Sequence, residues 1–209
     1  MSYANSVVVL DFETTGLSPD MGDRAIEIGA VRIEQGVVIE RFQELMNPGQ
    51  RVSGFIEDYT GISNDMLKDA APCEEVMERF AEFVGDGNLV AHNASFDKRF
   101  LDAEFARISR RYGGGFSCSL LAARRIFQDA PNHKLGTLVR YANIPSDGTF
   151  HRALYDSEMT VKVWMAMLDS INERYDWADV PFSAIQKLNK TPKKSVHQFL
   201  SKQSIRHSA

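Results

Sequence analysis

A run of apolar residues that ends in two acids constrains the fold more than any other feature of this chain. Residues 6–12 are rich in valine, which predicts a buried β-strand. Side chains alternate between the two faces of a strand, so Asp11 and Glu13 project from one face and Phe12 points into the core. Two carboxylates a few ångströms apart repel each other by roughly 4 kcal/mol at an effective dielectric constant near 20. The pair needs a cation unless the strand is an exposed edge, and the apolar residues 7–10 argue against an edge.

The segments that follow predict a mixed α/β protein. Residues 25–33 and 37–46 extend the first strand into an antiparallel meander, because the break between them is short enough for a hairpin. Residues 47–72 read as a loop with one short helical piece. Helices are expected at 63–67, 72–84, 95–111, 119–127, 135–143 and 152–175, and short strands at 89–91 and 116–119. This order is typical of a mixed sheet flanked by helices.

Three further residues are placed where sites commonly form. Asp97 begins a helix just after the strand at 89–91, where sheet proteins often carry functional groups. Its alternative role is that of a first-turn acid favoured by the helix dipole. His151 precedes the last long helix and Asp156 lies one turn into it, so the acid is held rigidly and the histidine can approach a substrate. Because imidazole titrates near neutrality, His151 can take a proton from an attacking water.

The four acids Asp11, Glu13, Asp97 and Asp156 share one chemical preference. Hard carboxylate oxygens that leave coordination positions open suit Mg²⁺ or Mn²⁺. Divalent ions held in this way, with a histidine beside them, are suited to the hydrolysis of phosphodiesters. The residues therefore predict a divalent metal centre that acts on a phosphate ester.

Three motifs carry a resemblance to a known family. They are Asp11-Phe12-Glu13-Thr14-Thr15-Gly16-Leu17, His92-Asn93-Ala94-Ser95-Phe96-Asp97 and His151-Arg152-Ala153-Leu154-Tyr155-Asp156, with the strand Ile26-Glu27-Ile28-Gly29-Ala30 after the first. In this order they resemble the DEDDh branch of the DEDD 3′→5′ exonucleases, above all the proofreading (epsilon) subunits of bacterial DNA polymerase III and their stand-alone relatives. The likeness covers about residues 6–172. It implies a ribonuclease-H-like fold with a mixed five-stranded sheet, in which parallel strands follow the meander.

The resemblance also implies roles for single residues. Two divalent ions, Mg²⁺ or Mn²⁺, are held by Asp11, Glu13, Asp97 and Asp156, and His151 is the general base. The residues expected to contact the terminal nucleotide are Thr14, Leu17, Ile62, Phe96 and His151. The implied reaction removes nucleoside 5′-monophosphates from the 3′ end of nucleic acid, expected here to be single-stranded DNA. The chain departs from the family pattern at Thr60, where relatives often have histidine, and at Tyr155, where a small residue is common.

Two alternatives to a DNA exonuclease stay open. One is an exoribonuclease of the same family, because only contacts to the 2′-hydroxyl separate RNA from DNA. The other is a degenerate module that binds nucleic acid or a polymerase without cleaving, which the presence of all five catalytic residues disfavours. The resemblance also allows a DNA polymerase, or another replication or repair protein, as a partner.

Charge is distributed unevenly along the chain. The formal net charge is −4, although nucleic-acid binders are more often basic. Residues 180–209 hold six lysines or arginines and no acid, so residues 1–179 carry −10. Two divalent ions would offset about +4 of that charge at the site. We expect an exonuclease domain over 1–176 and a basic C-terminal tail over 177–209, with a short helix at 195–202. The tail is either solvated disorder or a segment that holds the nucleic-acid backbone or a partner protein.

Composition limits where the protein is expected to act. No apolar run approaches the roughly 20 residues of a membrane span. Residues 1–5 lack the basic start of a secretory signal. Cys73 and Cys118 are far apart and lack the spacing of metal ligands, as expected of two reduced thiols. The sequence therefore predicts a cytoplasmic protein without a membrane segment.

Overall fold

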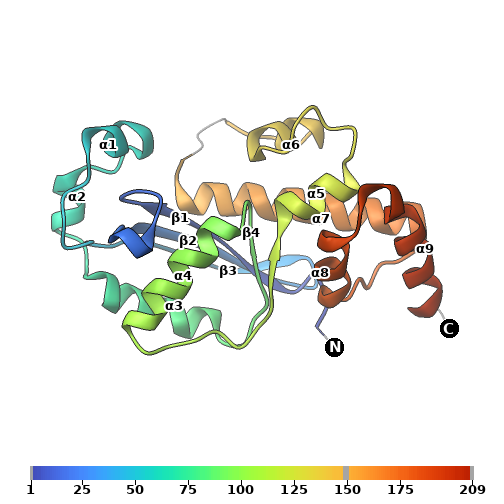
Figure 1. Ribbon diagram of the computed structural model, residues 1–209, viewed down its shortest axis with the longest axis horizontal. Helices are drawn as coiled ribbons and strands as arrows, with labels where there is room; N and C mark the ends of the chain where they lie inside the picture. Colours follow the sequence, from blue (N-terminus) through green and yellow to red (C-terminus); the bar gives the residue numbers. More distant parts are fainter. Residues whose placement is uncertain (1, 148–150, 208–209) are drawn as a thin grey trace.

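The computed structural model describes residues 2–147 and 151–207, which form a five-stranded mixed sheet flanked by helices (Figure 1). The strands are β1 (Val7–Thr14), β2 (Ala25–Glu34), β3 (Val37–Leu45), β4 (Leu89–Ala91) and β5 (Phe116–Cys118). Their order across the sheet is β3-β2-β1-β4-β5. The first three form the antiparallel meander, β4 pairs in parallel with β1, and β5 pairs in parallel with β4. The mixed five-stranded sheet predicted from the sequence is confirmed.

β1 lies in the middle of the sheet because it is apolar on both faces. Val8 and Leu10 pack in one core cluster with residues of α3 (Cys73–Val84) and α4 (Ser95–Arg107). Val9 belongs to a second cluster, formed with the long helix α7 (Ala153–Tyr175) on the opposite face. A strand covered on both faces reads as a continuous apolar run, as this one does.

The remaining helices surround this central unit. They are α1 (Gly54–Thr60), α2 (Asn64–Lys68), α5 (Ser119–Ile126), α6 (Leu135–Tyr141), α8 (Phe182–Lys190) and α9 (Val196–His207), with short 3₁₀ turns at Pro19–Met21 and Lys193–Ser195. α1 and α2 lie at one end of the molecule, and α8 and α9 lie at the other (Figure 1). No helix in the described ranges is long and apolar enough to cross a membrane. Both cysteines are free thiols, as predicted.

α7 begins in close contact with β2. A Cβ atom at Gly29 would lie 2.0 Å from the backbone nitrogen of Leu154, so any other residue at this position would push the helix away. The hydroxyl of Ser157 donates a hydrogen bond to the carbonyl oxygen of Gly29 at 2.9 Å. These two contacts fix the height of the first turn of α7 above the sheet, and this turn carries Asp156.

The segment 47–72 differs from the expectation of a loop with one short helix. The predicted helix at 63–67 is present as α2, but α1 precedes it. Ser53 caps α1 by accepting a hydrogen bond from the N–H of Ile56, and Gly61 ends it with a left-handed φ of 70°. With seven residues, α1 makes fewer than two turns. A helix this short gives only a weak periodic signal in the sequence.

The boundaries of two predicted helices also change. The helix expected over 95–111 ends at Arg107, because the chain turns at Ser109, where φ is 55°. The short helix expected over 195–202 is longer and runs over Val196–His207 as α9. The structure adds α8, which was not expected.

Residues 182–207 fold against the core, so of the two alternatives left open for the tail the structure does not show solvated disorder. Phe182, Ile185, Leu188 and Leu200 are buried in the same cluster as the apolar face of α7. Apolar residues at helical spacing bury one face of α8, while its lysines stay in solvent. The backbone N–H of Phe182 also donates to the carbonyl oxygen of Ser2 at 3.0 Å, which ties this region to the start of the chain.

Candidate active site

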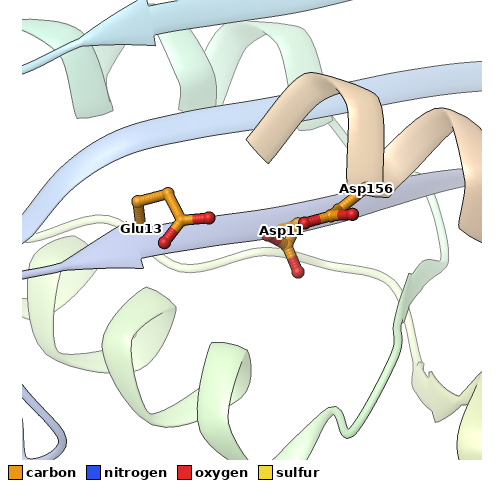
Figure 2. Close-up of side chains that lie close together, drawn as sticks. All are labelled: Asp11, Glu13 and Asp156. Carbon is orange, nitrogen blue, oxygen red and sulfur yellow. The ribbon is translucent and has the colours of Figure 1, made fainter. Parts of the chain in front are cut away.

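Three carboxylates meet near the C-terminal end of β1. Asp11 and Glu13 project from the face of β1 that α7 covers, and Asp156 reaches them from the first turn of α7 (Figure 2). One carboxylate oxygen from each residue lies within 4.8 Å of the other two. The structure thus brings together three of the four acids predicted as metal ligands, although Asp156 is distant from the other two in the sequence.

Asp97, the fourth predicted ligand, is buried beside this group. It lies in the first turn of α4, and its Oδ1 accepts a hydrogen bond from the backbone N–H of Phe12 at 3.2 Å. Among the described residues, the group whose oxygens all lie within 4.8 Å of one another does not include Asp97. Its charge nevertheless acts on the group, since it raises the pKa of Asp11.

Burial raises the pKa of all four carboxyl groups. The pKa of Asp11 rises well above its usual range, first because the group is buried and then because Asp97, Asp156 and Glu13 carry like charges. Burial and the charge of Asp156 raise the pKa of Glu13 to about 8. Burial raises the pKa of Asp97 to about 7 and that of Asp156 to about 6. A site that assembles acids where their charges are unfavourable favours the binding of cations.

Asp156 offers an oxygen that no described residue uses. Its Oδ2 accepts a hydrogen bond from the backbone N–H of His151 at 2.9 Å. Its Oδ1 is buried and has no hydrogen-bond partner in the described part of the chain. A buried acceptor without a donor costs free energy, and a cation bound to it would remove that cost. The all-oxygen donor set fits Mg²⁺ or Mn²⁺.

Glu27 holds the start of α7 in place. Although it is fully buried in β2, its carboxylate accepts hydrogen bonds from Arg152 Nη2 at 2.8 Å and from the N–H of Ala153 at 3.0 Å. The ion pair with Arg152 compensates the buried charge. Glu27 is not among the functional residues predicted from the sequence. A glutamate inside an apolar strand was the available signal, because such a charge needs a partner.

A cavity of about 700 Å³ opens beside the carboxylates. The predicted nucleotide contacts that line it are Thr14, Leu17, Phe96 and His151. Ile62 is not among the residues that line the cavity, so its predicted contact with the nucleotide stays a prediction. Its side chain is fully buried in a small separate core cluster with Ile26 and Leu67.

α1 supplies an aromatic wall that the sequence analysis missed. Phe55 and Tyr59 lie one helical turn apart, with 5.9 Å between their stacked ring centroids. The ring of Tyr59 contacts that of His151, with 4.1 Å between centroids. Phe55 is 72% exposed and lines the cavity, so the wall offers apolar surface to a ligand. Two aromatic residues four apart are the available signal, but Pro48-Gly49 and Ser53-Gly54 predict a loop around them.

The fold and the acidic cavity define a class of nuclease, and comparison with known proteins gives the family. The model of the exonuclease family RNase_T matches residues 8–164, so the chain belongs to this family. Similar curated proteins are the PolC-type DNA polymerases III of Bacillus cereus, 40% identical over 168 residues, and of Caldanaerobacter subterraneus, 37% identical over 172 residues. These matches cover 80% and 82% of this chain but 12% of the length of each relative. The family resemblance inferred from the three motifs is confirmed.

Solved structures share the fold. Exonuclease X in complex with 5′ overhanging duplex DNA matches with a TM-score of 0.66 and 24% identity, over 87% of this chain and 98% of that one. The nuclease domain of 3′hExo, described as a DEDDh family member bound to rAMP, matches with a TM-score of 0.68 and 19% identity, over 80% of this chain and 92% of that one. These likenesses establish a shared ribonuclease-H-like fold.

Proposed function

We propose that this protein is a metal-dependent 3′→5′ exonuclease that removes nucleoside 5′-monophosphates from single-stranded DNA. The observation that carries the proposal is the convergence of Asp11, Glu13 and Asp156 beside a cavity, with one buried oxygen of Asp156 left without a partner in the described chain. Membership of the exonuclease family supports the reaction type. The similarity to DNA polymerases III supports DNA as the substrate.

Four of the buried acids are proposed as metal ligands, whereas Glu27 is proposed to hold the start of α7 in place. Asp11, Glu13, Asp97 and Asp156 would hold two divalent ions, Mg²⁺ or Mn²⁺. When bound, such ions lower the pKa of water and offset the charge of the scissile phosphate. Glu27 stays outside the ligand set because Arg152 and Ala153 already satisfy its carboxylate.

His151 would act as the general base. Its side chain is exposed at the cavity, and its backbone N–H is tied to Asp156, so the base and a ligand are held in one unit. The neutral imidazole takes a proton from water as the water oxygen attacks phosphorus. The bond from phosphorus to the 3′-oxygen of the preceding nucleotide breaks, and that oxygen takes a proton from solvent water. The products are a nucleoside 5′-monophosphate and a strand shorter by one nucleotide.

The apolar lining of the cavity favours an unpaired 3′ end. Leu17 is 76% exposed, and it lines the cavity together with Phe96, Phe55 and Tyr59. Bases of a single strand present free faces that stack on such side chains, whereas paired bases do not. We therefore propose that the terminal nucleotide is held here, with Thr14 as a polar contact.

The experiment that tests this function is a product analysis. DNA and RNA oligomers labelled at the 3′ or the 5′ end, single- and double-stranded, would be incubated with Mg²⁺, Mn²⁺ or EDTA. We expect mononucleotides from the 3′ end of single-stranded DNA with either metal and no product in EDTA. Faster release from RNA would favour the exoribonuclease alternative. Metal-independent cleavage, or binding of every substrate without cleavage, would contradict the proposal.

A partner belongs to the same proposal. The curated relatives carry the matching region within a DNA polymerase III, so we propose that this protein works with a DNA polymerase or another replication or repair protein. The cytoplasmic location predicted from the sequence suits such a role. Purified polymerase should co-elute with the protein in gel filtration, and separate elution at micromolar concentration would count against a stable complex.

A further inference from the structure

A second cleft, of about 480 Å³, lies between α4, α5, β5 and α8. We call it the α8 cleft. The residues of this cleft that matter most are Lys98, Ser117, Cys118, Lys187, Asn189 and Lys190. Figure 1 shows α8 on the side of the sheet away from α1 and α2, with α4 between the two ends of the molecule.

The two cavities have opposite charge. The active-site cavity is lined by Asp11, Glu13 and Asp156, and no lysine or arginine lines it in the described ranges. The α8 cleft is lined by three lysines, and within the same ranges no acid lines it. Lys98 pairs with Asp102 on its own helix, but Lys187 and Lys190 are exposed and form no salt bridge within the described chain. Positive charge that is not used by the fold favours a polyanion.

The floor of the cleft offers further groups to a ligand. Asn189 is 8% exposed, and its Nδ2 donates to Ser117 Oγ at 2.9 Å and to the carbonyl oxygen of Cys118 at 3.2 Å. Its Oδ1 accepts no hydrogen bond from any described residue, although it is buried. Cys118 is the N-cap of α5 and makes no side-chain cap, so the positive end of this helix adds to the field of the lysines. The lysines and the positive end of α5 suit phosphate.

The first turn of α4 belongs to both cavities. Phe96 lines the active site, whereas Ala94, Ser95 and Lys98 line the α8 cleft. A strand whose 3′ end lies among the carboxylates therefore meets lysines after crossing a single helical turn. The lysines also add positive charge beside the carboxylates, along the path proposed for the negatively charged strand.

We propose that the α8 cleft binds the sugar-phosphate backbone of the substrate strand, upstream of its 3′-terminal nucleotides. This inference rests on the proposed exonuclease function and assigns a role to the basic residues of α8. A nucleic-acid strand is a better occupant than an acidic peptide, because the cleft adjoins the cavity that takes the 3′ end. The lysines of the cleft then contribute to binding and not to the chemical step.

A paired charge substitution tests the inference. The double variant K187Q/K190Q removes the two free lysines, and K68Q/K162Q is the matched control, because Lys68 and Lys162 are exposed and line neither cavity. For a long oligonucleotide we expect KM to rise about tenfold in K187Q/K190Q with kcat unchanged. The slope of log K against log salt should flatten by about 0.7 for each phosphate that the variant no longer neutralises. A dinucleotide substrate, too short to reach the cleft, should show no change, and the control should match the wild type.

Cys118 provides a second, direct measurement. Cys73 is buried and burial raises its pKa to about 12, so alkylation reports mainly on the partly exposed Cys118. A long strand with phosphorothioate linkages at its 3′ end, which resist cleavage, should slow alkylation of Cys118 more than tenfold. A dinucleotide should not, and protection should be lost in K187Q/K190Q.

The outcomes separate this inference from the proposed function. If the wild type degrades DNA while a long strand leaves Cys118 unprotected and the two double variants share one KM and one salt slope, the cleft is not a backbone site and the enzymatic function stands. If an acidic peptide protects Cys118 as well as DNA does, the cleft serves another kind of partner. If the wild type cleaves no nucleic acid, both proposals are overturned.

Discussion

Asp11 is unfavourable for folding, because its carboxylate is buried among like charges, but it is central to the proposed metal site. It lies among three other acids, and burial together with their like charges raises its pKa, so its charged form is unfavourable without cations. The position is unfavourable for a lone charge, but it brings a carboxylate oxygen of Asp11 close to oxygens of Glu13 and Asp156. A group that is unfavourable until a ligand binds is a mark of a functional site.

The substitution Asp11→Asn tests this conflict. It keeps the shape of the side chain and removes the charge, so we expect activity to fall more than about 100-fold, beyond the loss typical of a metal site's supporting residues. In EDTA the variant should melt at a higher temperature than the wild type, because a repelled charge is gone. The control is Asp65→Asn, whose side chain is 93% exposed in α2. Near wild-type turnover in Asp11→Asn would contradict a ligand role.

His151 is the second residue for which a sharp result is expected. Its φ of 74° lies in the left-handed region, which asparagine adopts more readily than most residues. His151→Asn therefore removes the imidazole without straining the backbone. We expect kcat to fall by roughly 10²–10⁴-fold, the usual contribution of a general base. His197→Asn, at an exposed position of α9, is the control. A loss below tenfold would show that another group takes the proton.

At the level of whole elements, the contact between β2 and α7 determines where Asp156 lies. Gly29→Ala would place a methyl group 2.0 Å from the backbone of α7, which must then move. Overpacking typically costs about 1–3 kcal/mol, and a backbone clash should reach the upper part of this range. We expect a lower melting temperature and a loss of activity together.

Gly54→Ala is the matched control for Gly29→Ala. No heavy atom lies within 4 Å of a Cβ built at Gly54, which begins α1. Alanine is also the better helix former, so this variant should keep full activity and wild-type stability or more. Thermal melts and turnover of the two variants, measured side by side, test whether the contact with β2 holds α7 in place. Equal behaviour of both would show that α7 is not held by its contact with β2.

The elements that the sequence predicted well are those with strong local patterns. β1 is marked by an uninterrupted apolar run, and α7 is marked by apolar residues at helical spacing over many turns. Both elements are present close to the expected bounds. α1 is not predicted, because the pairs Pro48-Gly49 and Ser53-Gly54 before it are typical of a loop. Without α1, a sequence reading cannot tell which side of this segment faces the cavity.

The metal-binding chemistry of the candidate site could be predicted from the sequence, but the contacts that hold its residues in place could not. Acids at the ends of apolar segments indicate a metal centre, and three of the four do meet. Which residue would neutralise Glu27 could not be read from the chain, because Arg152 lies 125 positions away. The close approach of α7 to Gly29 depends on tertiary packing in the same way.

At the scale of the whole molecule, the raised pKa values link folding to pH and to metal. A carboxyl group whose pKa is raised on folding keeps a proton that the unfolded chain has already lost. Unfolded aspartate and glutamate have pKa values near 4, whereas Glu13, Asp97 and Asp156 reach about 8, 7 and 6. Between those limits the unfolded chain binds fewer protons, so stability is greatest at low pH and is lost as the pH rises through the folded values.

We therefore expect the melting temperature in EDTA to be lower at pH 8 than at pH 5. A difference of at least about 4 °C is expected, since one kcal/mol corresponds to about 2–4 °C in a protein of this size. Mg²⁺ should raise the melting temperature more at pH 8 than at pH 5, because at low pH protons compete for the same oxygens. Calorimetry of the wild type and of Asp11→Asn tests both statements. A melting temperature that rises with pH in EDTA would contradict the assignment of the site.

The left-handed backbone conformation of His151 affects which substitutions this position tolerates. A residue other than glycine or asparagine in that conformation typically costs on the order of 1 kcal/mol. A screen for thermal tolerance alone should therefore enrich glycine and asparagine at this position, whereas a screen for turnover should reject both. The proposed general base would then occupy a backbone conformation that lowers the free energy of unfolding.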